Sequence, residues 1–259
     1  MAEERRPALE VTSLSKSFGA LPAVQDVSFA IEPGSLTCLI GPNGAGKSTL
    51  LTCVAGFLRP DGGRVVLDGR DISGWRAHRR ARAGLGTVFQ VMRAPQVDVW
   101  SSTMIGCHAW TRSGFASAIV RAPWQVREER AIRAEAWRAL ELVGLEGRAR
   151  DSADALPLGQ LRLLSVARVL AQRPRVLLLD EPAAGLRAAE KARLRTVLDD
   201  LRKRGLTQIL VEHDMQFVGA VAERVLVLDR GRLIADAPPA RVREDERVIE
   251  AYLGTATAL

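Results

Sequence analysis

The sequence lacks the features that mark membrane-spanning proteins, secreted proteins and cysteine-ligated metal sites. No apolar run approaches the roughly eighteen residues that a transmembrane helix needs. Residues 1–6 lead into no apolar signal core, so we expect the chain to stay in the cytosol, where it can still bind a membrane protein. The three cysteines, Cys38, Cys53 and Cys107, show no metal-type spacing and fit buried thiols in a reducing compartment.

Lysine is also scarce: only four of the 37 Lys and Arg residues are Lys. The net charge of +7 therefore comes mainly from arginine. The arginines are spread along the chain among acids, as in residues 127–130. Nucleic-acid-binding surfaces cluster their basic residues, so we expect no nucleic-acid partner, while a basic face toward anionic lipid stays open. No internal repeat is present, and 259 residues suffice for one large domain or two modest ones.

One glycine-rich stretch matches the phosphate-binding loop pattern of Gly, four residues and Gly-Lys-Ser/Thr. A buried strand is predicted before it at residues 36–40, and a helix after it at residues 50–58. Glycines let backbone N–H groups approach phosphate oxygens, and the helix N-terminus adds its positive dipole. The candidate nucleotide-binding residues of this loop are Gly41, Asn43, Gly44, Ala45, Gly46, Lys47, Ser48 and Thr49.

Two side chains of this loop have predicted roles in nucleotide chemistry. Lys47 is expected to reach the β- and γ-phosphates, and the Ser48 hydroxyl to ligate Mg²⁺. The alternative is a glycine-rich turn that binds nothing, which the register of Lys47 and Ser48 disfavours.

Two acids follow the apolar residues 176–179, which predict a strand at the centre of a parallel sheet. In phosphate-loop NTPases an acid in this place holds Mg²⁺, so Asp180 is a candidate metal ligand. Glu181 is then placed to polarise the water that attacks the γ-phosphate. The alternative is that these acids merely end a strand at solvent, and the presence of a phosphate loop in the same chain disfavours it.

Two further polar side chains end predicted strands. His213 lies just past residues 208–211, a strand expected to run parallel to the one that ends at Asp180, and ligands bind at the carboxyl edge of such sheets. Gln90 follows residues 86–89, and its amide can touch Mg²⁺ or the attacking water. Both are candidate catalytic residues, and Gln90 is also a candidate metal ligand.

The predicted elements indicate an α/β fold with a mainly parallel sheet and an N-terminal antiparallel β subdomain. Residues 91 to about 160 hold four of the five tryptophans, and there Val126, Ile132 and Leu140 predict a helix with one apolar face. We interpret this region as a helical subdomain inserted into the α/β core. Residues from about 235 to 259 are interpreted as a C-terminal helix and tail.

These motifs resemble those of the ATP-binding-cassette (ABC) ATPases, phosphate-loop NTPases with a RecA-like core, over nearly all of the chain. The resemblance implies that Phe18 stacks on adenine and that Gln90 links the γ-phosphate site to a transmembrane partner. It implies that Asp180 and Glu181 are the Mg²⁺-binding and catalytic-base pair. By the same resemblance His213 is the switch histidine.

The family's signature, Leu-Ser-Gly-Gly-Gln, corresponds to residues 156–160, so Gly159 and Gln160 are implied to contact ATP. The chain departs from the family at Pro157, where Ser is usual, at Leu158, where Gly is usual, and at Arg187, where Asp is usual. These departures predict a weakened signature and allow a heterodimer with unequal ATP sites. An ATP-gated switch protein with weak hydrolysis is therefore an alternative. A DNA-repair or translation ATPase is disfavoured, because the insertion is too short for a long coiled coil.

Three segments resemble the importers of branched-chain and other hydrophobic amino acids, namely residues 181–186, 212–215 and 248–254. A lipopolysaccharide-export ATPase group shares a similar ending. The resemblance implies ATP and Mg²⁺ as cofactors and a second ABC ATPase subunit as dimer partner, with two ATP molecules between the subunits. It also implies two transmembrane permease subunits, an indirect periplasmic or lipid-anchored substrate-binding protein, and a peripheral position on the inner face of the membrane.

Overall fold

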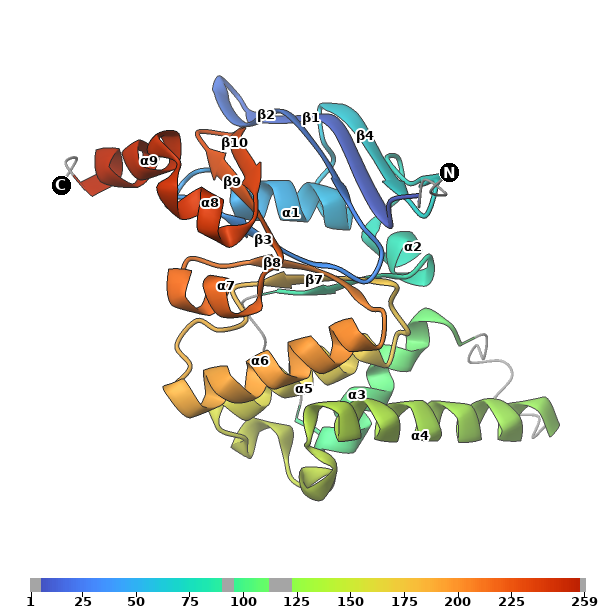
Figure 1. The fold of residues 1–259 in the computed structure, drawn as a ribbon. Helices are drawn as coiled ribbons and strands as arrows, with labels where there is room; N and C mark the ends of the chain where they lie inside the picture. The colour runs from blue at the N-terminus through green and yellow to red at the C-terminus, as the bar shows by residue number, and fades with distance from the viewer. Residues whose placement is uncertain (1–5, 90–95, 112–122, 257–259) are drawn as a thin grey trace, which may run out of the picture.

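The computed structural model describes residues 6–89, 96–111 and 123–256. Its centre is a six-stranded sheet with the strand order β10-β9-β3-β8-β7-β6 (Figure 1). Neighbouring strands are parallel except for β9 and β10, which form an antiparallel hairpin. The strands of this sheet are β3 (Leu36–Ile40), β6 (Leu85–Val88), β7 (Val176–Asp180), β8 (Thr207–Val211), β9 (Arg224–Asp229) and β10 (Arg232–Ala237).

The central strands β3, β7 and β8 are buried along their whole length, because both faces of the sheet are covered. Alternate side chains of β7 enter two different cores. Leu177 and Leu179 pack with residues of α5 (Leu158–Leu170) and α6 (Ala188–Lys203). Leu178 packs on the other face with residues of α1 (Lys47–Ala55). Helix α1 therefore lies on the opposite side of the sheet from α5 and α6 (Figure 1).

A second sheet of four antiparallel strands, in the order β2-β1-β4-β5, lies over α1 (Figure 1). Its strands are β1 (Leu9–Phe18), β2 (Leu21–Ile31), β4 (Gly62–Leu67) and β5 (Arg70–Asp71). This sheet confirms the predicted antiparallel subdomain. Strand β1 pairs with β2 as far as Phe18 opposite Leu21, which places Phe18 at the end of the hairpin.

The described residues between β6 and α5 form mainly helices, of which α3 (Val99–Gly106) and α4 (Pro123–Val143) pack on each other and on α5. Ala136 and Leu140 of α4 are fully buried, but Val126 is 45% exposed. The predicted apolar face is therefore wrong at Val126, because the amino-terminal part of α4 extends beyond α3 and α5 (Figure 1). The subdomain limits at about 91–160 and about 235 stay predictions.

Short helices complete the described chain, namely α2 (Ala77–Arg82), α7 (Met215–Val221), α8 (Pro239–Glu244) and α9 (Glu246–Ala256). Among the residues that the structure describes, no helix combines the length and the apolar character that a membrane span requires.

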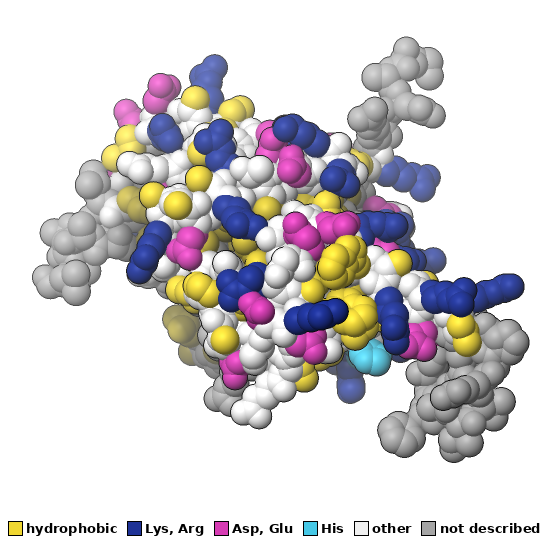
Figure 2. All heavy atoms as spheres, turned by 90° about the horizontal axis from the view of Figure 1, so that it is seen from below, with side chains coloured by type: hydrophobic (Ala, Val, Ile, Leu, Met, Phe, Trp, Pro, Cys, Tyr) yellow, Lys and Arg dark blue, Asp and Glu magenta, His cyan; other side chains and the backbone are white. Residues whose placement is uncertain are grey.

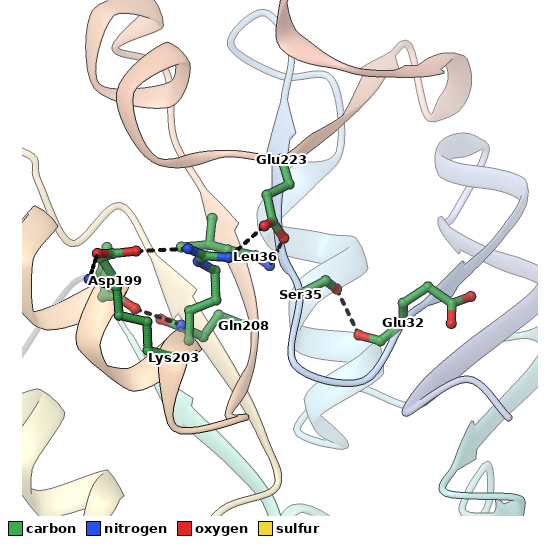
Figure 3. Close-up of polar contacts among 9 residues, drawn as sticks. Glu32, Ser35, Leu36, Asp199, Lys203, Gln208 and Glu223 are labelled. Carbon is green, nitrogen blue, oxygen red and sulfur yellow. Dashed lines mark hydrogen bonds and ion pairs between the residues drawn. The ribbon is translucent and has the colours of Figure 1, made fainter. Parts of the chain in front are cut away.

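Polar contacts join the end of α6 to the strand that leads into the glycine-rich loop (Figure 3). Arg202 donates to Glu223 at 2.6 Å and to Asp199 at 2.9 Å. The Glu223 carboxylate also accepts from the backbone N–H of Leu36, the first residue of β3, at 3.4 Å. These contacts set the position of β3 relative to α6.

Basic and acidic side chains are interspersed on the face of the molecule that is seen from below (Figure 2). Elsewhere among the described residues, opposite charges form ion pairs such as Glu129 with Arg133 and Glu135 with Arg173. This face therefore presents no unbroken basic surface.

The three cysteines are free and buried, as predicted. Burial raises the pKa of Cys53 and Cys107 to about 11 and also raises that of Cys38. Protonated thiols are weak nucleophiles and poor metal ligands, so these residues act as core side chains.

Candidate functional site

The loop between β3 and α1 has a backbone that only glycine can adopt at two places. Gly41 has φ of 151°, and a Cβ there would lie 2.0 Å from the carbonyl oxygen of Leu228. Gly46 has φ of 101°, and a Cβ there would lie 2.1 Å from the carbonyl oxygen of Ala23. The loop is thus pressed against β2 and the end of β9, and Gly46 is the N-cap of α1. Its N–H groups can then surround an anion at the helix N-terminus.

Lys47 is the first residue of α1, and its side chain turns back into the loop. Its Nζ donates to the carbonyl oxygens of Gly41 at 2.8 Å and Pro42 at 2.9 Å. Burial lowers the pKa of the Lys47 ammonium, and the charges of Glu181 and Asp180 partly oppose this. The ammonium therefore contacts the loop carbonyls and lies within electrostatic range of the two acids.

Asp180 ends β7 with a side chain that is nearly buried, at 9% exposure. Burial raises the pKa of its carboxyl and the charge of Glu181 adds to this, while Lys47 lowers it. Its Oδ1 is buried and has no hydrogen-bond partner among the described residues. A buried carboxylate oxygen without a donor fits a cation ligand, and the exposed Ser48 hydroxyl in the first turn of α1 offers a second oxygen of the kind Mg²⁺ prefers.

Glu181 and His213 approach each other at the carboxyl edge of the sheet. The Nδ1 atom of His213 lies 3.8 Å from Oε1 of Glu181. The Glu181 side chain is 23% exposed and that of His213 is 57% exposed, so both can reach a water molecule or a ligand. Glu181 has φ of 47°, and its N–H donates to the Val211 carbonyl at 3.0 Å. A side chain at positive φ costs free energy, and such strain is found mainly at functional sites.

Glu212 belongs to this site, although the sequence analysis did not single it out. Its side chain is 1% exposed, and burial raises the pKa of its carboxyl. Oε1 accepts from the Ala183 N–H at 2.8 Å, and Oε2 accepts from the His213 N–H at 3.4 Å. The signal in the sequence is a Glu placed directly after the apolar residues 209–211 of a buried strand, where a carboxylate needs backbone donors to remain buried.

The predicted residues outside the loop have separate surroundings. Phe18 is 52% exposed at the end of β1, with Lys16 Nζ 5.8 Å from the ring centroid, so its ring is open for stacking. Gly159, in the first turn of α5, lies against Glu190, and the Gln160 side-chain oxygen accepts from Arg148 at 3.2 Å.

The remaining predictions concern loop residues and Gln90. Asn43 and Gly44 are exposed at the tip of the loop, Ala45 is buried, and Thr49 is half-buried in α1. Gln90 lies outside the described residues, so its predicted roles stay predictions.

The family model of the ABC transporter matches residues 24–184, and that of the branched-chain amino acid ATP-binding cassette transporter matches residues 232–258. The high-affinity branched-chain amino acid transport ATP-binding protein BraF of Pseudomonas aeruginosa is 38% identical over 253 residues, which cover 97% of this chain and 99% of BraF. LivG of Escherichia coli K12, which carries the same description, is 36% identical over 255 residues, which cover 97% and 99%.

Solved structures of the same kind superpose on the fold. A nucleotide-free ATP-binding cassette of an ABC transporter has a TM-score of 0.82 at 28% identity and covers 95% of this chain and 98% of its own. The ADP conformation of such a cassette has a TM-score of 0.84 at 28% identity, with 96% and 99% covered. Both likenesses extend over the sheet, the loop and the helices described above.

Proposed function

Because the chain belongs to the ABC transporter family of ATP-binding subunits, we propose that its ATP hydrolysis drives the import of branched-chain or other hydrophobic amino acids. The observation that carries its ATPase chemistry is the placement of Lys47 after β3 and of Asp180 and Glu181 at the end of β7, at the same edge of the parallel sheet and within electrostatic range of one another. The relatives that match almost the whole chain, and the match over residues 232–258, support the substrate class.

The residues of the loop are proposed to bind the triphosphate of ATP. Phosphate oxygens would replace the two carbonyls that now accept from Lys47, since an anion is a better partner for a buried ammonium. The backbone N–H groups of the loop and the N-terminus of α1 add further donors. Phe18 would stack on the adenine ring, which its exposed position permits.

The acids and the histidine are proposed to carry the hydrolytic step. Asp180 and Ser48 would hold Mg²⁺, which neutralises charge on the β- and γ-phosphates. Glu181 would orient the attacking water and take its proton. His213 is close enough to Glu181 to contact the same water or the γ-phosphate. Glu212 would keep the backbone after Glu181 in place through Ala183.

The partners follow from the same family membership. As an ATP-binding subunit of an import system the chain works with membrane permease subunits. We propose two such permeases, a second ABC ATPase subunit, a substrate-binding protein outside the cell, and a peripheral place on the inner face of the membrane. Support for the permease contact comes from the rings of Phe57 and Phe89, which lie 4.8 Å apart; Phe89 directly precedes Gln90 in the sequence. Phe57 is 63% exposed, so its ring offers apolar surface to a partner protein.

A switch protein with weak hydrolysis is the second candidate, and one observation favours it. Pro157 is the N-cap of α5 and has no N–H to donate, and the Leu158 side chain after it is 50% exposed. A bulky side chain at this position alters the surface that the resemblance assigns to the nucleotide of the second subunit.

The Glu181→Gln variant separates these functions in the complex assembled with its permeases in proteoliposomes. We expect ATP turnover to fall by at least about 100-fold, with leucine uptake lost and ATP binding retained, because the amide cannot accept the proton. Glu10→Gln, an exposed change in β1, serves as the matched control and should leave both rates unchanged. Unchanged turnover in the Glu181→Gln complex would refute the enzymatic role. Turnover that depends on Glu181 without uptake of leucine, isoleucine, valine or another hydrophobic amino acid would refute the substrate class.

A further inference from the structure

Two carboxylates flank His213, and each binds a group in the segment that follows Glu181. On one side the Glu212 carboxylate accepts from the Ala183 N–H at 2.8 Å. On the other side the Asp214 carboxylate pairs with Nζ of Lys191 at 2.6 Å. Since the His213 side chain is 57% exposed, packing does little to hold it. Its place opposite Glu181 therefore depends on the backbone that these two neighbours fix.

Asp214 has two tasks at once. Its Oδ1 accepts from the N–H groups of Gln216 at 3.0 Å and Phe217 at 3.1 Å, so it is the N-cap of α7. Its other oxygen, Oδ2, binds Lys191. The hydrogen bond from Lys191 is the largest cause of the lowered pKa of Asp214, and the backbone bond from Phe217 is the next. The cap sets the direction of α7, and the ion pair sets the distance between Asp214 and α6.

The first turn of α6 also touches the signature segment. Glu190 accepts from the N–H of Arg187 at 2.8 Å, which closes the cap of α6. The same carboxylate lies so near Gly159 that a Cβ there would be 2.2 Å from Oε1 of Glu190. Consecutive residues of one helical turn thus contact the start of α5 through Glu190 and the residue after His213 through Lys191.

We propose that Lys191 is a positioning residue that holds His213 opposite Glu181 and ties it to the turn of α6 that packs on Gly159. This inference rests on the proposed function, because it assigns a part in ATP hydrolysis to the pair of Lys191 and Asp214. A shift of the turn, for instance when a second subunit contacts the segment around Arg187, would then move Asp214 and His213 with it. Rigid α6 carries the displacement, since Lys191 lies in its first turn.

The competing explanation is an ordinary ion pair on a half-exposed surface, which contributes little to anything. The two explanations differ in what they change. An ordinary pair affects stability slightly and leaves catalysis alone. A positioning pair affects the turnover number and leaves the affinity for ATP alone, because within the described residues Lys191 pairs with Asp214 rather than with the loop assigned to the triphosphate.

The test measures ATP turnover and nucleotide affinity for the full-length chain and its variants. In Lys191→Met we expect kcat to fall by about tenfold with KM for ATP unchanged, since small misplacements of a catalytic group cost this much or more. Lys191→Arg restores a cation and should recover most of kcat. Lys203→Met is the matched control, because Lys203 lies on the same helix and pairs with Asp199 at 2.7 Å (Figure 3). It should leave kcat unchanged.

A second variant guards against loss of the fold. Asp214→Asn keeps an N-cap side chain for α7 but removes the charge that binds Lys191. It should lower kcat as Lys191→Met does, and the double variant should be no worse than either single one. A kcat within twofold of the wild type in Lys191→Met, or additive losses in the double variant, would overturn the inference. If Lys47→Ala also left turnover unchanged, the proposed function itself would be wrong, whereas loss in Lys47→Ala alone would reject only the role of Lys191.

Discussion

The two ends of α1 each hold a buried cation whose hydrogen bonds go to backbone carbonyls. At the amino end Lys47 donates to Gly41 and Pro42. At the carboxyl end Arg80 is 1% exposed. It donates to the carbonyls of Cys53 at 3.0 Å and Val54 at 2.6 Å, both in the last turn of the helix. Burial lowers the pKa of both side chains.

The surroundings of the two cations predict different roles for them. Arg80 also donates to the carbonyls of Trp75 at 2.9 Å and Ser73 at 2.8 Å, so four carbonyls surround its planar fork. Lys47 lies beside the charges of Glu181 and Asp180, and its carbonyls belong to a loop that opens to an anion. A cation whose donors are used by backbone carbonyls stabilises the fold. A cation whose carbonyl partners can be replaced by an anion can bind a ligand.

Removing the amino-end cation should have the largest effect. In Lys47→Ala we expect ATP turnover to fall by at least about 100-fold, because the phosphates lose their buried charge. The free energy of unfolding should stay the same or rise, since a buried ammonium is costly. Turnover assays and urea denaturation measure the two quantities. Wild-type turnover in this variant would remove the assignment of the phosphate loop.

Removing the carboxyl-end cation should act on stability instead. Arg80→Met removes one donor from each of four carbonyls, of which that of Cys53 keeps the Gly56 N–H, so we expect the free energy of unfolding to fall by about 3 kcal/mol. Arg82→Met changes an exposed arginine of the same helix and should cost less than about 0.5 kcal/mol. Urea denaturation checks both variants. Equal stability of the two would contradict the structural role of Arg80.

The smallest expected effect that distinguishes Lys47 from Arg80 is the pH dependence of ATP binding. ATP needs the charged form of Lys47, so affinity should fall as pH rises past its lowered pKa, by at most about tenfold per unit. Stability should change in the opposite direction. Because the unfolded chain holds this proton more tightly than the folded one, the free energy of unfolding rises with pH in the same window. Titrations with a fluorescent nucleotide between about pH 7 and pH 10 measure the affinity, and urea denaturation over the same range measures the stability. Lys47→Met should show neither trend.

Much of the site could be predicted because it depends on local sequence. The largely apolar residues 36–40 and 176–179 predict central strands of a covered sheet, and the phosphate loop and Asp180 follow them directly. The helix predicted at residues 50–58 is correct in type but wrong in its bounds. The structure begins α1 at Lys47, after Gly46, and ends it at Ala55, because Gly56 adopts the left-handed conformation of a helix end. This shift of three residues brings Lys47 itself into the first turn.

The sequence by itself determined the phosphate loop, the apolar strands and the order of acids and histidine along the chain, because each is a pattern among near neighbours. Only the tertiary structure decided which side chains meet. Glu212 binds Ala183 across 29 residues, Lys191 binds Asp214 across 23, and Arg80 binds Cys53 across 27. Such contacts depend on how whole helices and strands pack, and the pattern of any one segment contains no information about its partner.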